Sequence, residues 1–387
     1  MQDFAVITRI IITNPIFSGK EDNMFNNAIT IGTIARIPIR LHLTLLLAFP
    51  LLTWLFGTQI ATMAQEAGLE LSQNVFVLGL ILTLALFVSV GLHELGHALV
   101  ARGRGIHIKD ITLMLFGGVA QLDEEFSHNP ANEFAIALAG PAVSLGLGLG
   151  ALVFAQLMPV PDLYVVIFYL AWLNIVLAVF NLLPAFPTDG GRILRSLLAR
   201  KMSYLAATRF AVSLGQLFAV LFGVFGFLSG NFFLIFIAVF VYMGASQEYQ
   251  ASLLRQTLSG FTVADLMTAK ISSVPANYSV QQLVEQMYRE RHSGYPVMKE
   301  GRLVGCVTME DIQKVEPRLR EFKTVEDIMS TEIKAVAPED DIYLALRRLS
   351  ELEIGRLFVL KDEQLVGIIT RTDIMKGFRL RLLESER

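Results

Sequence analysis

The chain has 387 residues, of which 53% are apolar and only 17% charged, against about 25% charged residues in an average soluble protein. The net charge of −3 suggests no nucleic-acid partner, and a single cysteine, Cys306, excludes intrachain disulfides and a cysteine-based zinc site. Residues 41–250 contain long blocks nearly free of charge, whereas residues 262–387 have an ordinary soluble composition. The composition therefore predicts a membrane part followed by a soluble part.

Residues 1–28 form an N-terminal extension without a clear secretory signal peptide. The extension mixes Asn14-Pro15 with the charged run Lys20-Glu21-Asp22, and Met24 stands just before residues that are typical of short strands. We interpret Met24 as a candidate translation start, with Met1 as the alternative. N-terminal sequencing of the native protein would decide between them.

Six apolar stretches are long enough to cross a bilayer, which takes about 20 residues. They lie at about 42–62, 74–101, 132–157, 163–185, 206–228 and 231–247. The last two are separated by a turn at 228–231, because the charge-free run 210–247 is too long for one span. In the third span, Ala142, Gly146 and Gly150 are four residues apart and predict close packing against another helix.

The loops before the first span, after the second and after the fourth carry lysine and arginine, whereas the loops at 63–73, 158–162 and 229–230 carry none. Basic loops stay on the cytoplasmic side of a membrane. We therefore expect a multi-pass protein of the cell membrane, with both termini and the soluble part in the cytoplasm.

The second span ends in the motif His93-Glu94-Leu95-Gly96-His97, which follows 19 residues without a charge. On a helix, His93 and His97 share one face and can bind one metal ion, and Glu94 stands beside them where a general base is needed. A charged side chain inside a membrane costs about 2.5–3.5 kcal/mol on insertion scales and is rare unless it is functional. The motif therefore predicts a zinc peptidase that works within the membrane.

Catalytic zinc usually has three protein ligands and a water, so a third ligand is needed. Asp189 is the best candidate, because it is the only carboxylate between Leu163 and Arg192 and it follows the fourth span, which runs in the same direction as the second. Prolines at 184 and 187 end the helix, and the glycine pair after Asp189 permits a sharp turn. The alternative is an acid at the membrane interface without a ligand role.

The two motifs, His93-Glu94-Leu-Gly-His97 and Asn181-Leu-Leu-Pro-Ala-Phe-Pro-Thr-Asp189-Gly-Gly, resemble as a pair the site-2 protease family of intramembrane zinc metalloproteases. The resemblance covers about residues 29–377 and is strongest to the prokaryotic branch with a C-terminal tandem CBS pair. It implies one Zn²⁺ held by His93, His97 and Asp189, with Glu94 as the general base. It also implies that Asn181 lies near the site and helps to bind the substrate carbonyl oxygen.

Phe116-Gly117-Gly118-Val119 resembles the membrane-edge strand of that family, which can hold an extended substrate. A helical substrate must unwind before attack, and an unwound backbone in lipid is costly unless its polar groups find partners. An edge strand supplies such partners by pairing with the substrate. The alternative is a hairpin or re-entrant loop that does not contact substrate.

The soluble part contains an internal repeat with an offset of 62 residues. Val263-Ala-Asp-Leu-Met matches Val325-Glu-Asp-Ile-Met, and the segment ending at Asp311 matches the segment ending at Asp373. Each unit predicts a helix, strands, and a Thr-x-x-Asp sequence that can cap a further helix. The repeat resembles a tandem CBS pair. Such pairs often bind ATP, ADP or AMP and commonly form homodimers.

By this resemblance, the nucleotide contacts fall on Thr308, Asp311, Thr370 and Asp373. The alternative is that these four residues only cap helices, because threonine and aspartate are favoured residue types at helix N-termini.

The sequence thus predicts a polytopic α-helical membrane protein, with six transmembrane helices and a short membrane-associated β element, followed by an α/β tandem CBS domain. The expected divisions are 1–28 as the extension, 29–250 as the protease domain, 251–261 as a linker, 262–318 and 323–380 as the CBS repeats, and 381–387 as a tail. The expected function is hydrolysis of a peptide bond in or near the transmembrane segment of a membrane-anchored protein, regulated by the CBS pair.

Two other functions are compatible with parts of the pattern. A CBS-regulated metal-ion transporter or channel would use the intramembrane histidines and acids as a path, but it has no need for a base next to an i, i+4 histidine pair. An inactive relative would bind membrane proteins without cutting them, but the intact Glu94 argues against it.

Overall fold

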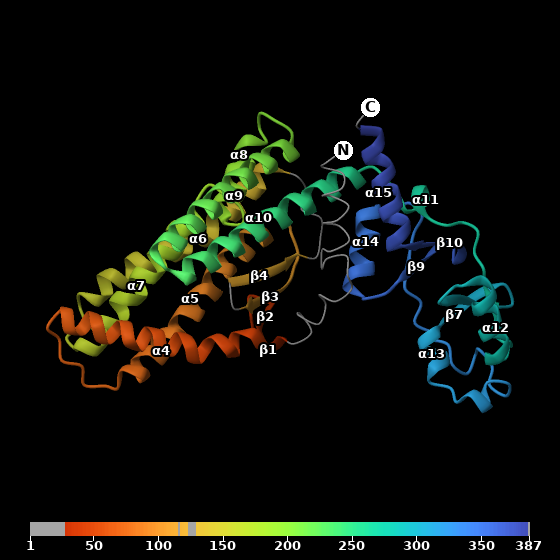
Figure 1. Cartoon of the computed structure of the whole chain (residues 1–387), viewed down its shortest axis with the longest axis horizontal. Coiled ribbons are helices and arrows are strands. Elements are labelled where there is room, and N and C mark those ends of the chain that lie inside the picture. The colour runs from red at the N-terminus through yellow and green to blue at the C-terminus, as the bar shows by residue number, and fades with distance from the viewer. Residues whose placement is uncertain (1–27, 115–116, 123–128, 386–387) are drawn as a thin grey trace. The chain divides into compact units, whose positions relative to one another are not determined.

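The computed structural model describes residues 28–114, 117–122 and 129–385. The N-terminal extension with Met24, and Phe116 of the predicted edge strand, lie outside the described residues. The described chain divides into two compact units, a membrane unit that ends at Leu253 and a C-terminal unit that begins at Leu254 (Figure 1).

Six helices of the described residues are long and apolar enough to cross a membrane, which confirms the predicted spans. They are α4 (Leu43–Glu66), α5 (Val75–Gly103), α6 (Pro130–Ala155), α7 (Pro161–Asn181), α9 (Tyr204–Ser229) and α10 (Phe232–Leu258). Large apolar side chains such as Leu47 and Phe227 are almost fully exposed on these helices. Such exposure is expected of a surface that faces lipid rather than water.

A seventh helix of the membrane unit, α8 (Asp189–Leu198), lies between α7 and α9 and is too short to cross a bilayer. The sequence predicts a basic loop over these residues, because their charges hide the helical pattern. The structure shows instead a strongly amphipathic helix whose buried side includes Gly191, Arg195 and Ser196.

The predicted β element is a four-stranded sheet in the order β1 (Ala28–Ile34), β2 (Ile37–His42), β3 (Ile108–Met114) and β4 (Gly117–Leu122). Strands β2 and β3 are parallel, and the other neighbouring pairs are antiparallel. Because β4 is the last strand in the order, it is an edge strand. Apolar residues of β2 and β3 pack against Leu95 and Ala98 of α5. The sheet is therefore attached to the same helix that carries His93 and His97.

Close helix packing depends on other glycines than those predicted. A Cβ at Gly146 or Gly150 would meet open space, so that prediction is wrong. Gly148 faces Ala171 and Ile175 of α7 instead, and Gly96 of α5 faces Ala139 and Val143 of α6. The four-residue spacing identifies a row of small residues on the helix. Which row faces a neighbouring helix depends on the rotation of the helix about its axis, and the spacing does not show that rotation.

The C-terminal unit contains two similar halves, each with one three-stranded sheet. The elements of the first half are α11 (Val263–Leu266), β5 (Val274–Pro275), α12 (Val280–Glu290), β6 (Gly294–Lys299), β7 (Arg302–Thr308), α13 (Met309–Gln313) and the 3₁₀ helix η1 (Pro317–Leu319). Those of the second half are β8 (Ala335–Val336), α14 (Ile342–Glu351), β9 (Arg356–Lys361), β10 (Gln364–Thr370) and α15 (Arg371–Ser385).

The two halves exchange their first segments. Val263 of α11 is buried in the core of the second half, together with Leu254 and Leu258 from the end of α10. Conversely, Val325 and Met329 pack in the core of the first half. Each half is therefore completed by residues from outside it, so the two hydrophobic cores of the C-terminal unit depend on each other.

Candidate metal centre

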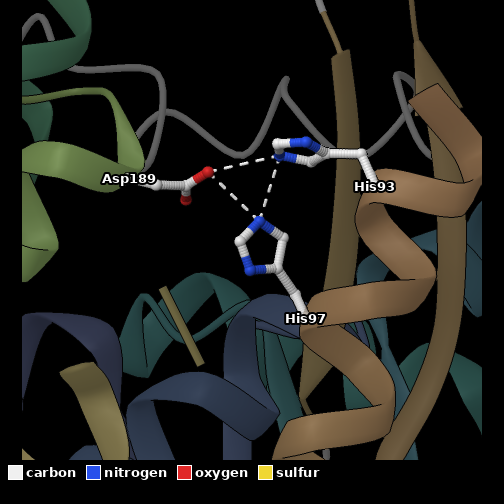
Figure 2. Close-up of side chains that lie close together, drawn as sticks. All are labelled: His93, His97 and Asp189. Carbon is white, nitrogen blue, oxygen red and sulfur yellow. Dashed lines mark hydrogen bonds and ion pairs between the residues drawn. The ribbon is translucent and has the colours of Figure 1, made fainter. Parts of the chain in front are cut away.

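His93, His97 and Asp189 converge on one point in the membrane unit (Figure 2). The two histidines lie one turn apart on α5, and Asp189 is the first residue of α8. The Oδ2 atom of Asp189 lies 3.2 Å from Nε2 of His93 and 3.1 Å from Nε2 of His97, and the two Nε2 atoms are 3.1 Å apart. Three potential ligand atoms thus form a nearly equilateral triangle.

The size of this triangle fits a tetrahedral zinc ion. With bonds of 2.0–2.1 Å, two ligand atoms of a tetrahedral site lie about 3.3 Å apart. The observed separations of 3.1–3.2 Å are close to that value. The group contains two imidazoles and a carboxylate, which are ligands that zinc commonly takes in catalytic sites.

The Nδ1 atoms of both imidazoles, which are the ring nitrogens outside the triangle, also have partners. Nδ1 of His97 lies 2.7 Å from the carbonyl oxygen of Ile136, which can only accept, so Nδ1 carries the proton and Nε2 of the neutral ring is left with its lone pair. Nδ1 of His93 lies 2.8 Å from the hydroxyl of Ser144, which is fully buried. Such outer partners fix the orientation and tautomer of metal-binding histidines.

Gly140 of α6 allows that helix to lie against the imidazoles. A Cβ at this position would overlap Nε2 of His97 and come within 2.6 Å of Nε2 of His93. The next residue, Pro141, lies inside the helix. The Ala-Gly-Pro sequence of this helix therefore supplies the close approach that brings Ile136 and Ser144 to the two rings.

The loop before α8 holds Asp189 in place. The hydroxyl of Thr188 donates to the carbonyl oxygens of Leu183 and Ala185 at 2.7 and 2.8 Å, and Gly190 lies so close to Leu183 that a Cβ there would overlap its carbonyl oxygen. Burial alone would raise the pKa of Asp189, but the contacts with His93 and His97 outweigh it and hold the pKa below its ordinary value. The carboxylate is therefore ionised and can act as a ligand.

Glu94 lies beside the triangle and next to the edge strand. A Cβ on Gly118 of β4 would overlap Cγ of Glu94 and lie 2.7 Å from its carboxyl carbon. The backbone of β4 therefore passes directly over the Glu94 side chain. Gly117 and Val119 belong to the same strand, and Asn181 is the last residue of α7 and partly buried.

A buried arginine, Arg195 of α8, is a site residue that the sequence analysis missed. It contacts Glu133 and Glu248. In the sequence it is one of several basic residues of the loop after the fourth span, and no local signal shows that its charge is buried.

In the C-terminal unit, the predicted nucleotide residues form two equivalent capping boxes. The hydroxyl and backbone N–H of Thr308 donate to Oδ2 of Asp311 at 2.8 and 2.9 Å. Thr370 bonds to Asp373 in the same way, at 2.5 and 3.2 Å. Burial would raise the pKa of Asp311, but the bonds from Thr308 outweigh it and the pKa lies below its ordinary value.

A second residue missed from the sequence is Arg356, which lies where the two halves meet. Its guanidinium contacts the carbonyl oxygen of Gly294 and donates to the hydroxyl of Ser293 at 2.9 Å. Gly294 and Thr308 are paired across β6 and β7, and Arg356 and Thr370 across β9 and β10. Burial lowers the pKa of Arg356, and the described ion pairs include none for it.

The membrane unit matches the family model for peptidase family M50 over residues 81–164 and 158–222, and the C-terminal unit matches the CBS domain over residues 263–317 and 325–379. A zinc metalloprotease of Methanocaldococcus jannaschii is 35% identical over 362 residues, which are 93% of this chain and 99% of the relative. A relative from Synechocystis is 30% identical over 367 residues, or 91% and 95% of the two chains.

Among solved structures, a site-2 protease from Methanocaldococcus jannaschii is 38% identical, with a TM-score of 0.41, and covers 57% of this chain and 95% of its own. Identity to the zinc metalloprotease along nearly the whole of both chains favours a protease over a transporter. The chain belongs to the site-2 protease family, peptidase family M50, and is an intramembrane zinc metallopeptidase with tandem CBS domains.

Proposed function

We propose that His93, His97 and Asp189 hold the catalytic zinc and that Glu94 is the general base of peptide hydrolysis. The observation that carries this proposal is the triangle of ligand atoms, 3.1–3.2 Å on each side, with Glu94 beside it. Because the outer nitrogen of His97 is bound to a carbonyl oxygen, a lone pair of that ring points into the triangle together with the Asp189 carboxylate. A cation in the triangle stabilises this arrangement, because it attracts both the lone pair of the ring and the negative carboxylate.

Glu94 takes a proton from the attacking water and delivers it to the leaving amide nitrogen. The zinc ion, when bound, polarises the scissile carbonyl and lowers the pKa of water to about 7. Asn181 at the end of α7 donates a hydrogen bond to the substrate carbonyl oxygen, where negative charge develops.

The substrate is a membrane-anchored protein that pairs in extended form with the edge strand. The backbone of residues 117–119 of β4 supplies hydrogen-bonding partners to the unwound substrate segment, whose polar groups otherwise find no partners in lipid. Gly118 supports this role, because β4 is an edge strand and its backbone lies against Glu94. A substrate on β4 therefore has its scissile bond next to the general base.

The active site opens to the cytoplasm, and the CBS unit and both termini lie on that side. The distribution of lysine and arginine supports this orientation. His97 lies near the C-terminal end of α5, and all the basic short loops fall on the same side of the membrane as that end.

The CBS pair binds an adenine nucleotide between its halves and regulates cleavage. Thr308, Asp311, Thr370 and Asp373 contact the ribose and phosphate groups, and Arg356 adds a cation. The half-buried guanidinium of Arg356 supports this, because a buried charge is stabilised by an ion of opposite sign and a phosphate fits its planar donors. The CBS units of two chains also associate, so the protein forms a homodimer. Sedimentation of the purified protein in detergent measures the mass of the particle and so tests this.

The protease proposal is tested with the full chain purified in detergent. We expect one zinc per chain in the wild type and in Glu94→Gln, whereas cleavage of single-span reporter proteins falls by about 10²–10⁴-fold in Glu94→Gln only. Glu70→Gln, at an exposed loop glutamate, is the matched control and should cleave as the wild type does. Equal cleavage by the Glu94 variant and the wild type would contradict the proposal.

The nucleotide proposal is tested by calorimetry of the full chain with ATP, ADP and AMP. We expect heat of binding for at least one of them, and weaker binding by Arg356→Gln. Arg318→Gln, an exposed arginine paired with Glu316, serves as the control. No heat with any of the three nucleotides would leave the four Thr and Asp residues with a capping role only.

A further inference from the structure

A single buried arginine, Arg195 of α8, connects four other segments of the membrane unit. The side chain is 6% exposed. Its Nε donates to Glu133 of α6 at 2.7 Å, and its Nη1 donates to Glu248 of α10 at 2.6 Å. The guanidinium also lies over the rings of Phe186, in the loop before α8, and of Tyr204, the first residue of α9, each at 4.7 Å. Its surroundings are thus two carboxylates and two aromatic faces.

The position of Asp189 depends on what holds α8. A helix of ten residues has little stability of its own, so its place is set by tertiary contacts. Asp189 is the first residue of α8, and Arg195 lies near the other end. Phe186, which stacks on Arg195, is only three residues before Asp189. Arg195 therefore anchors both the helix and the loop that present the carboxylate.

The charges around Arg195 do not balance, since one guanidinium faces two carboxylates. The side chain of Glu133 is 8% exposed and that of Glu248 is 28% exposed. Glu133 and Arg195 thus form the buried neutral pair, and Glu248 brings an additional negative charge from a more exposed position. Burial would lower the pKa of Arg195, but the charges of Glu248 and Glu133 outweigh it, so the group stays charged. Desolvation of the additional charge offsets part of its attraction.

Helix α10 also touches the loop that precedes Asp189. Gly244 lies against the ring of Pro187, where an added Cβ would be 2.8 Å from Cγ, and Ala245 is fully buried in one cluster with Phe186. The same helix continues to Leu258, and its last turns, with Leu254 and Leu258, are buried in the core of the second CBS half. One continuous helix therefore contributes to both units.

We propose that Arg195 is a positioning residue for Asp189, and that its bond to Glu248 makes the metal affinity of the site depend on the position of α10. This inference rests on the proposed function, in which His93, His97 and Asp189 are the metal ligands. A displacement of α10 removes Glu248 from Arg195 and Gly244 from Pro187 together. Both changes loosen the loop and helix that hold Asp189.

The test uses the full chain in detergent, with Co²⁺ in place of Zn²⁺, because the visible absorption of Co²⁺ reports ligand geometry independently of activity. Glu248→Gln keeps the shape of the side chain and removes its charge. We expect about a tenfold lower Co²⁺ affinity and a changed visible spectrum, a loss no larger than removal of a direct partner of a metal ligand produces. Arg195→Lys keeps the charge but loses the planar guanidinium that faces both carboxylates and lies over two rings, so a larger loss is expected.

Glu70→Gln is the matched control. It makes the same substitution as Glu248→Gln, but at an exposed loop position. The control should bind Co²⁺ as the wild type does. If Glu248→Gln folds and shows the affinity and spectrum of the wild type, the inference is overturned and the proposed metal site stands. If the wild type binds no stoichiometric Co²⁺, or His93→Ala binds it equally well, the proposed site fails and the inference fails with it. Should Arg195→Lys not fold, Glu248→Gln decides alone.

Discussion

Each unit of the molecule contains an aspartate in the first turn of a short helix, and the two are used in opposite ways. Asp311 accepts hydrogen bonds from the backbone and hydroxyl of Thr308 and so caps its own helix. Asp189 leaves the N-terminus of α8 without such a cap and contacts His93 and His97 of another helix. Thr188, at the N-cap position of α8, directs its hydroxyl back to the preceding loop.

The difference separates a structural acid from a candidate ligand. A carboxylate that satisfies its own helix is explained by local stability. One that contacts distant side chains, whose own outer nitrogens already have partners, requires another explanation, and a metal ion supplies it. The same residue type at similar helix positions thus has a different role in each unit.

The largest effect, a loss of zinc affinity, is expected where Gly140 of α6 approaches the two imidazoles. Gly140→Ala places a methyl group 2.1 Å from Nε2 of His97 and 2.6 Å from Nε2 of His93. Both rings must therefore move, and zinc affinity should fall by more than about 100-fold. Competition with a zinc chelator measures this. Gly146→Ala on the same helix adds a methyl group in open space and should bind zinc as the wild type does. Tight zinc binding by Gly140→Ala would show that the rings do not need this position.

Gly118→Ala should separate catalysis from metal binding. The new methyl group displaces the Glu94 side chain, and a misplacement of about 1 Å can cost about 100-fold in rate. Zinc content should remain at the wild-type level, because the atoms nearest to the new methyl group all belong to Glu94 and not to the three candidate ligands. Turnover and zinc content measured on one preparation check this, and a loss of both together would argue against the separation.

Ser144→Ala removes the partner of the outer nitrogen of His93 and should weaken zinc binding by about tenfold, at the lower end of the usual range for such partners. Thr83→Val is the control, since the hydroxyl of this buried residue donates to Gly79 of its own helix. Competition with a chelator again measures the zinc affinities. Equal affinities for both variants would show that Ser144 does not support metal binding.

The smallest effect is expected for the capping acid. Asp311→Asn should destabilise α13 by about 0.5–1 kcal/mol, read from hydrogen exchange of its amides. The pKa of Asp311 is depressed, so its contribution is present above the ordinary value of 3.8 and is lost as the pH falls through the folded value. Wild type and variant should therefore converge in acid. Glu310→Gln, an exposed neighbour, should differ little from the wild type at neutral pH.

Much of the molecule could be predicted because its signals are local. The spans follow from runs of apolar residues, since a bilayer admits only segments of about 20 such residues. The histidine pair follows from helical spacing, since residues four apart share a face. Asp189 could be selected because it is the only carboxylate near the end of the fourth span.

The contacts that complete the site are not local, and only the tertiary structure decided them. Ser144, Ile136 and Gly140 come to the imidazoles from another helix, and its rotation selects Gly148 rather than Gly146 for packing. The sequence marks Arg195 only as part of a basic loop and does not single out Arg356, because it does not show which charges are buried. The sequence by itself determined which groups can bind a metal, through spacing along one helix. The packing of α6, α8 and the β4 edge around that helix determined where those groups meet, because close approach between helices depends on side-chain shape over distances that no local pattern records.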